Sequence, residues 1–141
     1  MDLLIILRDA LASSVMGGML AAIDAKQSGL SVGVLVTQEA LAGLAGGTLA
    51  WPRELAPQGV RFPMCDRAAQ LGVPVAGSGQ GRRLDARATV RQASEAGVAL
   101  YACPLWSALL GLAAPPDGFT AIDRADLPKL LTNAKRVIGT L

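Results

Sequence analysis

Cys103 is the residue whose surroundings in this sequence most favour chemistry. It follows an apolar run rich in strand-forming residues, 98–102, and it precedes Pro104 and an amphipathic stretch. Proline fits the first turn of a helix, where its missing N–H would have no partner anyway. A cysteine between a strand and a helix faces the positive end of the helix dipole, which favours the nucleophilic thiolate. The alternative is that Cys103 is a small buried hydrophobic residue, as free cysteines often are.

Cys65, the only other cysteine, lies in the sequence Phe-Pro-Met-Cys-Asp. It could resolve an oxidised Cys103 by forming a disulfide, which would make the pair a redox relay. The ordinary alternative is a cysteine without a chemical role at a helix start or in a loop. The neighbouring carboxylate of Asp66 disfavours a thiolate at Cys65.

Histidine is absent from the sequence, and this narrows the chemistry further. A serine or cysteine hydrolase that depends on histidine is excluded within this chain. Two cysteines without histidine do not form a zinc site, so we expect no metal and no other cofactor. The net charge of +2 and the 4 % aromatic content argue against nucleic acid as a partner.

Arginines in the middle of the chain are the remaining candidates. Arg82 and Arg83 end a glycine-rich stretch, 77–83, that lacks the spacing of a phosphate-binding motif, so we expect a flexible surface loop. A second interpretation is a lid whose two arginines attract an anion or an acidic partner. Arg87 and Arg91 lie four residues apart on an expected helix and share a face, which we expect to be solvated.

Trp106 lies three residues after Cys103 on the expected helix. It is a candidate supporting residue, because it could shield the thiol from water or pack on a neighbouring subunit. Packing within the core is the simpler expectation.

Strands and helices are expected to alternate along the chain. Short apolar runs predict strands, and periodic apolar positions with Gly or capping residues at their ends predict helices. The expected strands are 2–7, 31–36, 98–102, 119–122 and 135–140, with a brief extended piece at 73–76. The expected helices are 15–28, 37–44, 64–71, 85–96, 104–112 and 123–134. Ser13 or Ser14 is expected to cap the first helix, and the proline-containing stretch 47–63 is expected to be a loop or insertion.

This alternation predicts one α/β domain over residues 1–141. It would be a three-layer sandwich with a mainly parallel sheet of about five strands flanked by helices. Ligands in such folds bind at the carboxyl ends of the strands, where Cys103 is expected. The 52 % hydrophobic content suits buried parallel strands and an oligomer that hides part of its surface. No apolar segment is long enough for a membrane span and no signal peptide is evident, so a cytoplasmic location is expected.

The segment Tyr-Ala-Cys-Pro-Leu-Trp-Ser-Ala-Leu-Leu-Gly-Leu, residues 101–112, resembles the DsrE/DsrF-like family. Members carry a comparable strand that ends in a cysteine and is followed by a helix with a Met-Gly or Leu-Gly step. Residues 15–37 resemble the first helix and second strand of that family, and 118–141 resemble its closing strand, helix and strand. The order of elements and the cysteine position carry the resemblance, which covers most of the chain.

The resemblance implies a three-layer α/β fold, a cytoplasmic homo-oligomer that is often a trimer or hexamer, and a role in sulfur relay. In relay members the matching cysteine carries a persulfide and passes the sulfur to a partner protein; here that residue is Cys103. Some members are only peroxiredoxin-like. The sequence departs from the pattern in the stretch 47–63, in the loop 77–83, and at Pro104 and Trp106.

Three functions therefore stand beside one another. The first is a sulfur carrier or sulfurtransferase-like protein with Cys103 as nucleophile and a donor or acceptor protein as partner. The second is a non-catalytic oligomeric subunit that presents a surface to a partner and keeps Cys103 buried and unreactive. The third is a two-cysteine thiol redox protein, which requires Cys65 and Cys103 to approach within about 7 Å between Cα atoms.

Overall fold

A computed structural model describes residues 1–139 and 141 of the chain. Five parallel strands form the main sheet, in the order β6-β5-β2-β1-β7. These strands are β1 (Leu3–Leu7), β2 (Val32–Val36), β5 (Ala99–Ala102), β6 (Thr120–Ala121) and β7 (Arg136–Ile138). The predicted α/β fold with a five-stranded parallel sheet is confirmed, and all five expected main-sheet strands are present.

Apolar residues on both faces of the inner strands explain this sheet. Every residue of β2 is buried, as expected for a parallel strand covered by helices on both sides. Its register runs from Leu3 opposite Val32 to Leu7 opposite Val36 on one side, and it pairs with β5 on the other. The strands therefore all end at one edge of the sheet, which is where ligands bind in such folds.

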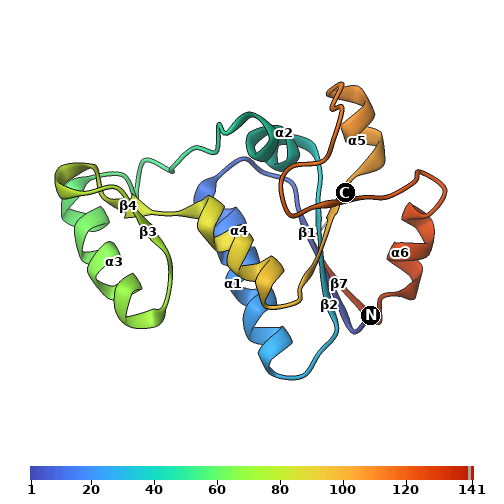
Figure 1. Ribbon diagram of the computed structural model, residues 1–141, viewed down its shortest axis with the longest axis horizontal. Helices are drawn as coiled ribbons and strands as arrows, with labels where there is room; N and C mark the ends of the chain where they lie inside the picture. The colour runs from blue at the N-terminus through green and yellow to red at the C-terminus, as the bar shows by residue number, and fades with distance from the viewer. Residues whose placement is uncertain (140) are drawn as a thin grey trace.

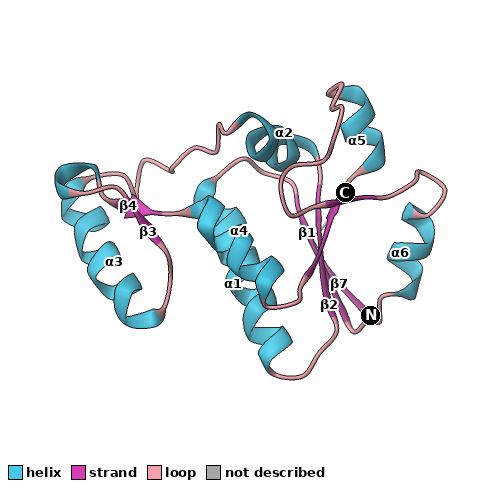
Figure 2. Cartoon of the chain, viewed as in Figure 1, coloured by secondary structure: helices cyan, strands magenta, loops and turns pink. Residues whose placement is uncertain are grey.

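Helices cover the two faces unequally (Figures 1 and 2). The helices of the main layers are α1 (Ala12–Gln27), α2 (Gln38–Gly46), α4 (Ala86–Glu95), α5 (Pro104–Leu109) and α6 (Leu127–Asn133). On one face α1 and α4 pack together and enclose a core that includes Val15, Met19 and Val90. On the opposite face a smaller cluster around Leu4 and Leu35 is covered by α6.

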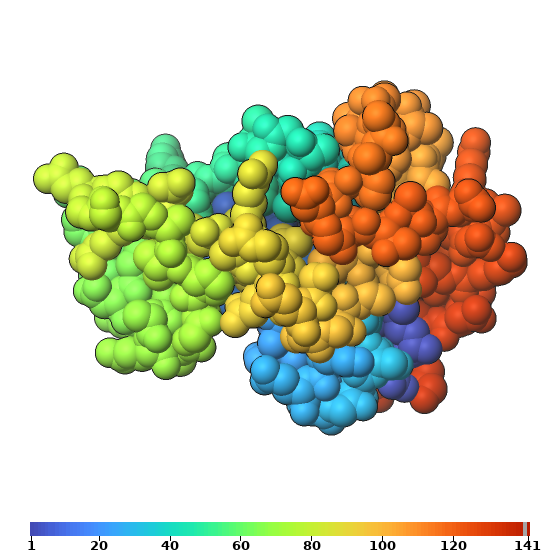
Figure 3. Space-filling model, in the orientation of Figure 1, coloured from blue at the N-terminus to red at the C-terminus, as the bar shows by residue number. Residues whose placement is uncertain are grey.

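A lobe beside the main sheet holds the remaining elements. It consists of α3 (Gln58–Leu71) and a two-stranded antiparallel hairpin of β3 (Val75–Ala76) and β4 (Arg83–Leu84), joined by the 3₁₀ turn η1 (Gly79–Gly81). Figure 3 shows this lobe at one end of the molecule. The expected loop or insertion at 47–63 is shorter than predicted, because α3 begins at Gln58 and continues through Pro63.

The start of α1 also differs from expectation. Ser13 and Ser14 lie inside the helix, which begins at Ala12, and neither caps it. Instead, the N–H of Ala12 donates to the carbonyl of Ala50 at 2.8 Å, and the N–H of Ala50 donates to the carbonyl of Ala10 at 3.0 Å. A distant backbone segment thus satisfies a helix N–H that a serine side chain was expected to serve.

None of the helices in the described part of the chain combines the length and the apolar character that a membrane crossing requires.

Candidate functional site

Cys103 lies immediately after β5, at the edge of the sheet where the strands end. Its backbone φ of −61° and ψ of 123° are extended, and α5 begins at the next residue, Pro104. The Cys103 N–H donates to the carbonyl of Val36 at 2.9 Å, and its carbonyl accepts from the N–H of Ser107 at 2.9 Å. Cys103 therefore continues the pairing of β5 with β2 and at the same time closes the first turn of α5.

The thiol of Cys103 faces the smaller core, on the side of the sheet that α6 covers. The residue is 2 % exposed and clusters with Leu4, Ile6 and Leu35. Trp106 packs against both hydrophobic clusters and so lies between the two sides of the core at this edge. In the isolated chain the thiol is therefore closed off from bulk solvent.

Thr37 is a functional candidate that the sequence analysis did not single out. Val36 lies opposite Ala102 in the register of β2 and β5, so Thr37 and Cys103 are the next residues of the two strands. Thr37 is 1 % exposed, and its hydroxyl has no hydrogen-bond partner among the described residues. A buried hydroxyl without a partner costs free energy. Its place directly after a buried strand was the only indication in the sequence.

Backbone strain occurs beside this threonine. Gln38 is the only described residue other than glycine with a positive φ, at 50°. Non-glycine residues rarely adopt this conformation, and when they do it is often at a functional site. The end of β2 thus combines an unpartnered hydroxyl with an unusual backbone next to Cys103.

A shallow cavity of about 310 Å³ lies next to Cys103, between α5 and the end of β6. Pro104 and Ser107 line it on one side, and Ile122 and Arg124 line it on the other. Cys103 itself does not line this cavity. A reagent that reached the thiol from here would have to displace the start of α5.

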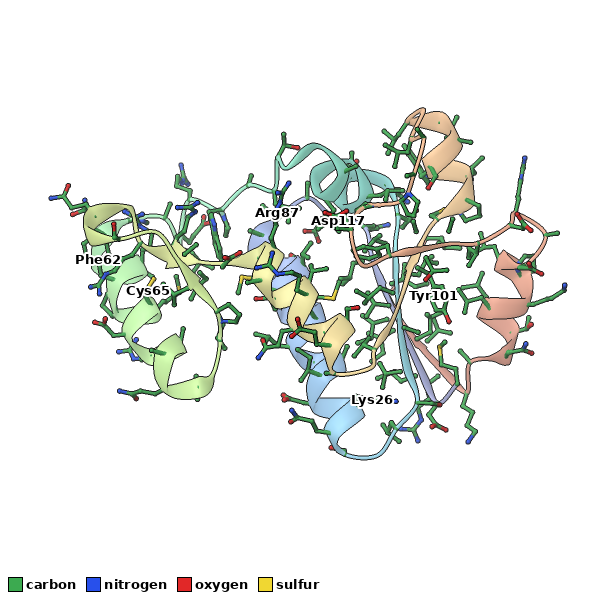
Figure 4. All side chains as sticks on the ribbon, in the orientation of Figure 1. Lys26, Phe62, Cys65, Arg87, Tyr101 and Asp117 are labelled. Atoms are coloured by element: carbon green, nitrogen blue, oxygen red, sulfur yellow. The ribbon has the colours of Figure 1, made fainter. Side chains whose placement is uncertain are left out.

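Cys65 is in a different part of the molecule. It lies on α3 in the lobe, 3 % exposed, whereas Cys103 lies at the junction of β5 and α5 (Figures 1 and 4). Helices α1 and α4 lie between the two positions, and both cysteines are free thiols. Within one chain the structure does not bring them together.

The stretch 77–83 includes the exposed turn that connects β3 to β4, so it lies at the surface as expected. Arg61 on α3 donates to the carbonyls of Gln80 and Arg82, at 2.8 and 3.2 Å. Arg82 pairs with Asp66 at 3.0 Å and lies 4.7 Å over the centre of the Phe62 ring. The guanidinium of Arg82 therefore contacts other residues of the lobe, Asp66 and Phe62.

Arg83 is in a different position from its neighbour. It lines a cavity together with Arg87 and Arg91, so the structure gathers three of the arginines singled out in the sequence. Among the described residues, no group of three or more acidic or cysteine side chains is placed to hold a metal ion.

No protein-family model matches the chain, and no curated protein is significantly similar to it.

Proposed function

We propose that the protein is a sulfur carrier of the DsrE/DsrF type, in which Cys103 holds sulfane sulfur as a persulfide. The observation that carries the proposal is the position of Cys103 at the carboxyl end of the interior strand β5, directly before the proline that begins α5. This position combines the functional edge of a parallel sheet with a cysteine at a helix start.

The reaction would be a sulfur transfer without net oxidation. Once α5 has moved, the thiol of Cys103 loses its proton to solvent, and the thiolate attacks the outer sulfur of a donor persulfide. The sulfur–sulfur bond of the donor breaks, and the donor leaves as a thiolate with the electron pair. Cys103 then carries the persulfide. In the second transfer an acceptor thiolate attacks the outer sulfur, and Cys103 leaves as the thiolate.

The hydroxyl of Thr37 supports this proposal. An anionic persulfide needs a hydrogen-bond donor when it is held away from water. Thr37 ends the strand next to Cys103 and has a buried hydroxyl without a partner. No metal or organic cofactor is required for the transfer.

The burial of Cys103 requires α5 to move before a donor can reach the thiol. This helix has six residues, none of them buried, and Leu109 near its end is 65 % exposed. Short helices with few buried contacts open at low free-energy cost. A donor or acceptor protein that binds α5 would provide the opening.

Mass spectrometry of the intact protein after exposure to glutathione persulfide tests the proposal. The wild type should gain the mass of one sulfur atom, and the Cys65→Ala variant should gain it equally. The Cys103→Ala variant should not. The same gain in Cys103→Ala as in the wild type would disprove the proposal.

A second candidate function is favoured by the 2 % exposure of Cys103. The protein would then be a non-catalytic subunit whose oligomer presents a surface to a partner. Labelling of the native protein by a thiol reagent distinguishes the two functions. Labelling of Cys103 only at the rate of global unfolding supports the subunit, whereas faster labelling supports the sulfur carrier.

Self-association belongs to both candidate functions, and exposed apolar side chains support it. Leu71 is 77 % exposed on α3, and Ile138 is 57 % exposed on the edge strand β7. Unprotected edge strands and large exposed apolar residues favour association. We propose that the protein is a cytoplasmic homo-oligomer, either a trimer or a hexamer. Light scattering of the protein as it elutes from a size-exclusion column would measure the mass of the oligomer. A monomer at micromolar concentration would contradict it.

A further inference from the structure

Three arginines line a groove beside α4 that the sulfur-carrier proposal does not use. The groove comprises two adjoining cavities, of about 420 and 340 Å³, and Arg87 and Arg91 line both of them. Arg83 lines the larger cavity. Helix α4 precedes β5 and runs against the strands, so its first turn lies at the edge where the strands end.

These guanidinium groups lack acidic partners in the described part of the chain. The described ion pairs involve Arg82, Lys129 and Lys135 and none of the three. Arg83 donates one hydrogen bond, to the carbonyl of Gly81 at 3.2 Å. Side-chain hydrogen bonds of Arg87 and Arg91 are absent among the described residues, so most donors of the three groups are free for a ligand.

Two carboxylates face the groove and must be counted against its positive charge. Asp85 lines the larger cavity, but it caps α4 by accepting the N–H of Ala88 at 2.9 Å. Asp117 lines the smaller cavity together with Arg87, and both residues are labelled in Figure 4. The larger cavity is lined by three arginines and by one carboxylate, that of Asp85. The net charge of its lining is therefore positive.

Gly47 leaves room for one of the arginines. It directly follows α2 in a left-handed conformation, with a φ of 65°, and a Cβ atom there would lie 3.0 Å from Nη2 of Arg87. The guanidinium therefore lies directly over the end of α2, in space that a side chain would occupy. Glycine permits both the backbone conformation and this approach.

Apolar and aromatic side chains also line part of the larger cavity. They include Trp51 and Leu44, and Leu84 of β4 closes the side next to the lobe. A cavity in which charged groups converge beside apolar side chains can hold a small organic ligand that has a charged end and an apolar part.

We infer that this groove binds a small organic phosphate, whose phosphate oxygens lie on Arg83, Arg87 and Arg91 and whose remaining part lies against Trp51. Planar guanidinium groups match phosphate oxygens in geometry and charge, and several of them together favour a multiply charged group. The inference is independent of sulfur transfer, because Cys103 lies on the other face of the sheet, in the cluster that α6 covers.

Fluorescence of Trp51 tests the inference. The chain has two tryptophans, so a Trp106→Phe background leaves Trp51 as the only indole in the protein. Titration of this protein with inorganic pyrophosphate and with ADP should change the emission in a saturable way that weakens as salt is added. ADP should bind more tightly than pyrophosphate, because its base and ribose would lie against the apolar wall.

Two double variants separate a built site from general charge. Arg87→Gln/Arg91→Gln removes two groove charges, and Arg124→Gln/Arg136→Gln removes two charges elsewhere. The first should weaken binding of pyrophosphate by at least about tenfold, since bonds to charged groups contribute strongly. The second should bind as the background does. Circular dichroism verifies that all three proteins are folded. Equal weakening in both variants, or no saturable binding by the background protein, would overturn the inference.

Discussion

Nζ of Lys135 lies 2.7 Å from Oδ1 of Asp2, although 133 residues separate the two in the chain. The other carboxylate oxygen of Asp2 accepts the N–H and the hydroxyl of Ser31, each at 2.8 Å. One aspartate thus joins the starts of β1 and β2 to the residue before β7. These bonds, with Lys135 contributing most and Ser31 next, hold the pKa of Asp2 well below its usual value.

The Asp2→Asn substitution should make the free energy of unfolding less dependent on pH in the acidic range. A lowered pKa in the folded state contributes stability above the unfolded pKa, near 3.8 for aspartate, and this contribution is lost as the pH falls. The wild type should therefore be more stable than Asp2→Asn at pH 7, and the difference should shrink below about pH 4. Urea unfolding midpoints between pH 7 and pH 3 measure this. Asp24→Asn is the control, because the carboxylate of Asp24 forms no hydrogen bond and no ion pair with any described residue. A gap that stays constant with pH would contradict the expectation.

Thr37→Val should stabilise the protein while impairing persulfide formation at Cys103. The variant removes a buried hydroxyl without a partner and keeps the shape of the side chain, so a gain of about 1 kcal/mol in the free energy of unfolding is expected. Chemical unfolding measures the gain, and the intact-mass assay measures the rate of sulfur uptake.

Thr89→Val is the matched control for this substitution. Thr89 is equally buried, but its hydroxyl donates to the carbonyl of Asp85 at 2.8 Å. Its loss should destabilise the protein by about 1 kcal/mol and leave sulfur uptake unchanged. Destabilisation by Thr37→Val would show instead that its hydroxyl has a structural role.

Gly47→Ala should destabilise the protein and displace Arg87. A Cβ atom at this left-handed position costs about 1 kcal/mol, and it would press on Nη2 of Arg87 at 3.0 Å. Thermal unfolding should show the loss, and pyrophosphate binding should weaken with it. Gly46→Ala is the control, since Gly46 is the last residue of α2 and has only ordinary contacts with Thr48. If Gly47→Ala proved as harmless as Gly46→Ala, the space at Gly47 would not be needed for the position of Arg87.

Arg61→Met should release the hairpin of the lobe. Arg61 is the residue that donates to the carbonyls of both Gln80 and Arg82, and methionine keeps its apolar contacts without these bonds. Limited trypsin digestion should then cut after Arg82 or Arg83 several times faster, because cleavage of a folded protein follows local opening. Arg67→Met on the same helix is the control. Unchanged cleavage at the hairpin would mean that the pair of Arg82 and Asp66 is sufficient to hold it.

The central strands could be predicted from the sequence because their residue types leave few alternatives. Both 2–7 and 31–36 are short apolar runs bounded by polar residues and glycine, and the structure places β1 and β2 within them. Cys103 was correctly expected at the end of a strand for the same reason. Residues buried on both faces identify themselves without knowledge of their neighbours.

Helix α3 was harder to predict because it lacks these regularities. Pro63 interrupts its hydrogen bonding, and only Cys65 and Ala68 are buried. It packs mainly on the hairpin of its own lobe, so no continuous apolar stripe marks it in the sequence. The predicted serine cap of α1 was wrong for a related reason. The N–H of Ala12 donates to the backbone of Ala50, which is distant in the sequence.

The arginine-lined groove could not be predicted from the sequence, for a third reason. The spacing of Arg87 and Arg91 showed that they share a helix face, but not what lies opposite that face. Only the fold brings Gly47 under Arg87 and places Trp51 in the same cavity. Convergence of segments that are remote in the chain leaves no local pattern to read.

The order of the strands has a consequence for synthesis of the protein. The strands β6, β5, β2 and β1 follow one another across the sheet, and the chain then crosses to the far edge to add β7 beside β1. On the ribosome, β1 leaves first and its outer edge stays uncovered until β7 has emerged. During that interval the nascent chain displays an unpaired strand edge, which favours association with other chains.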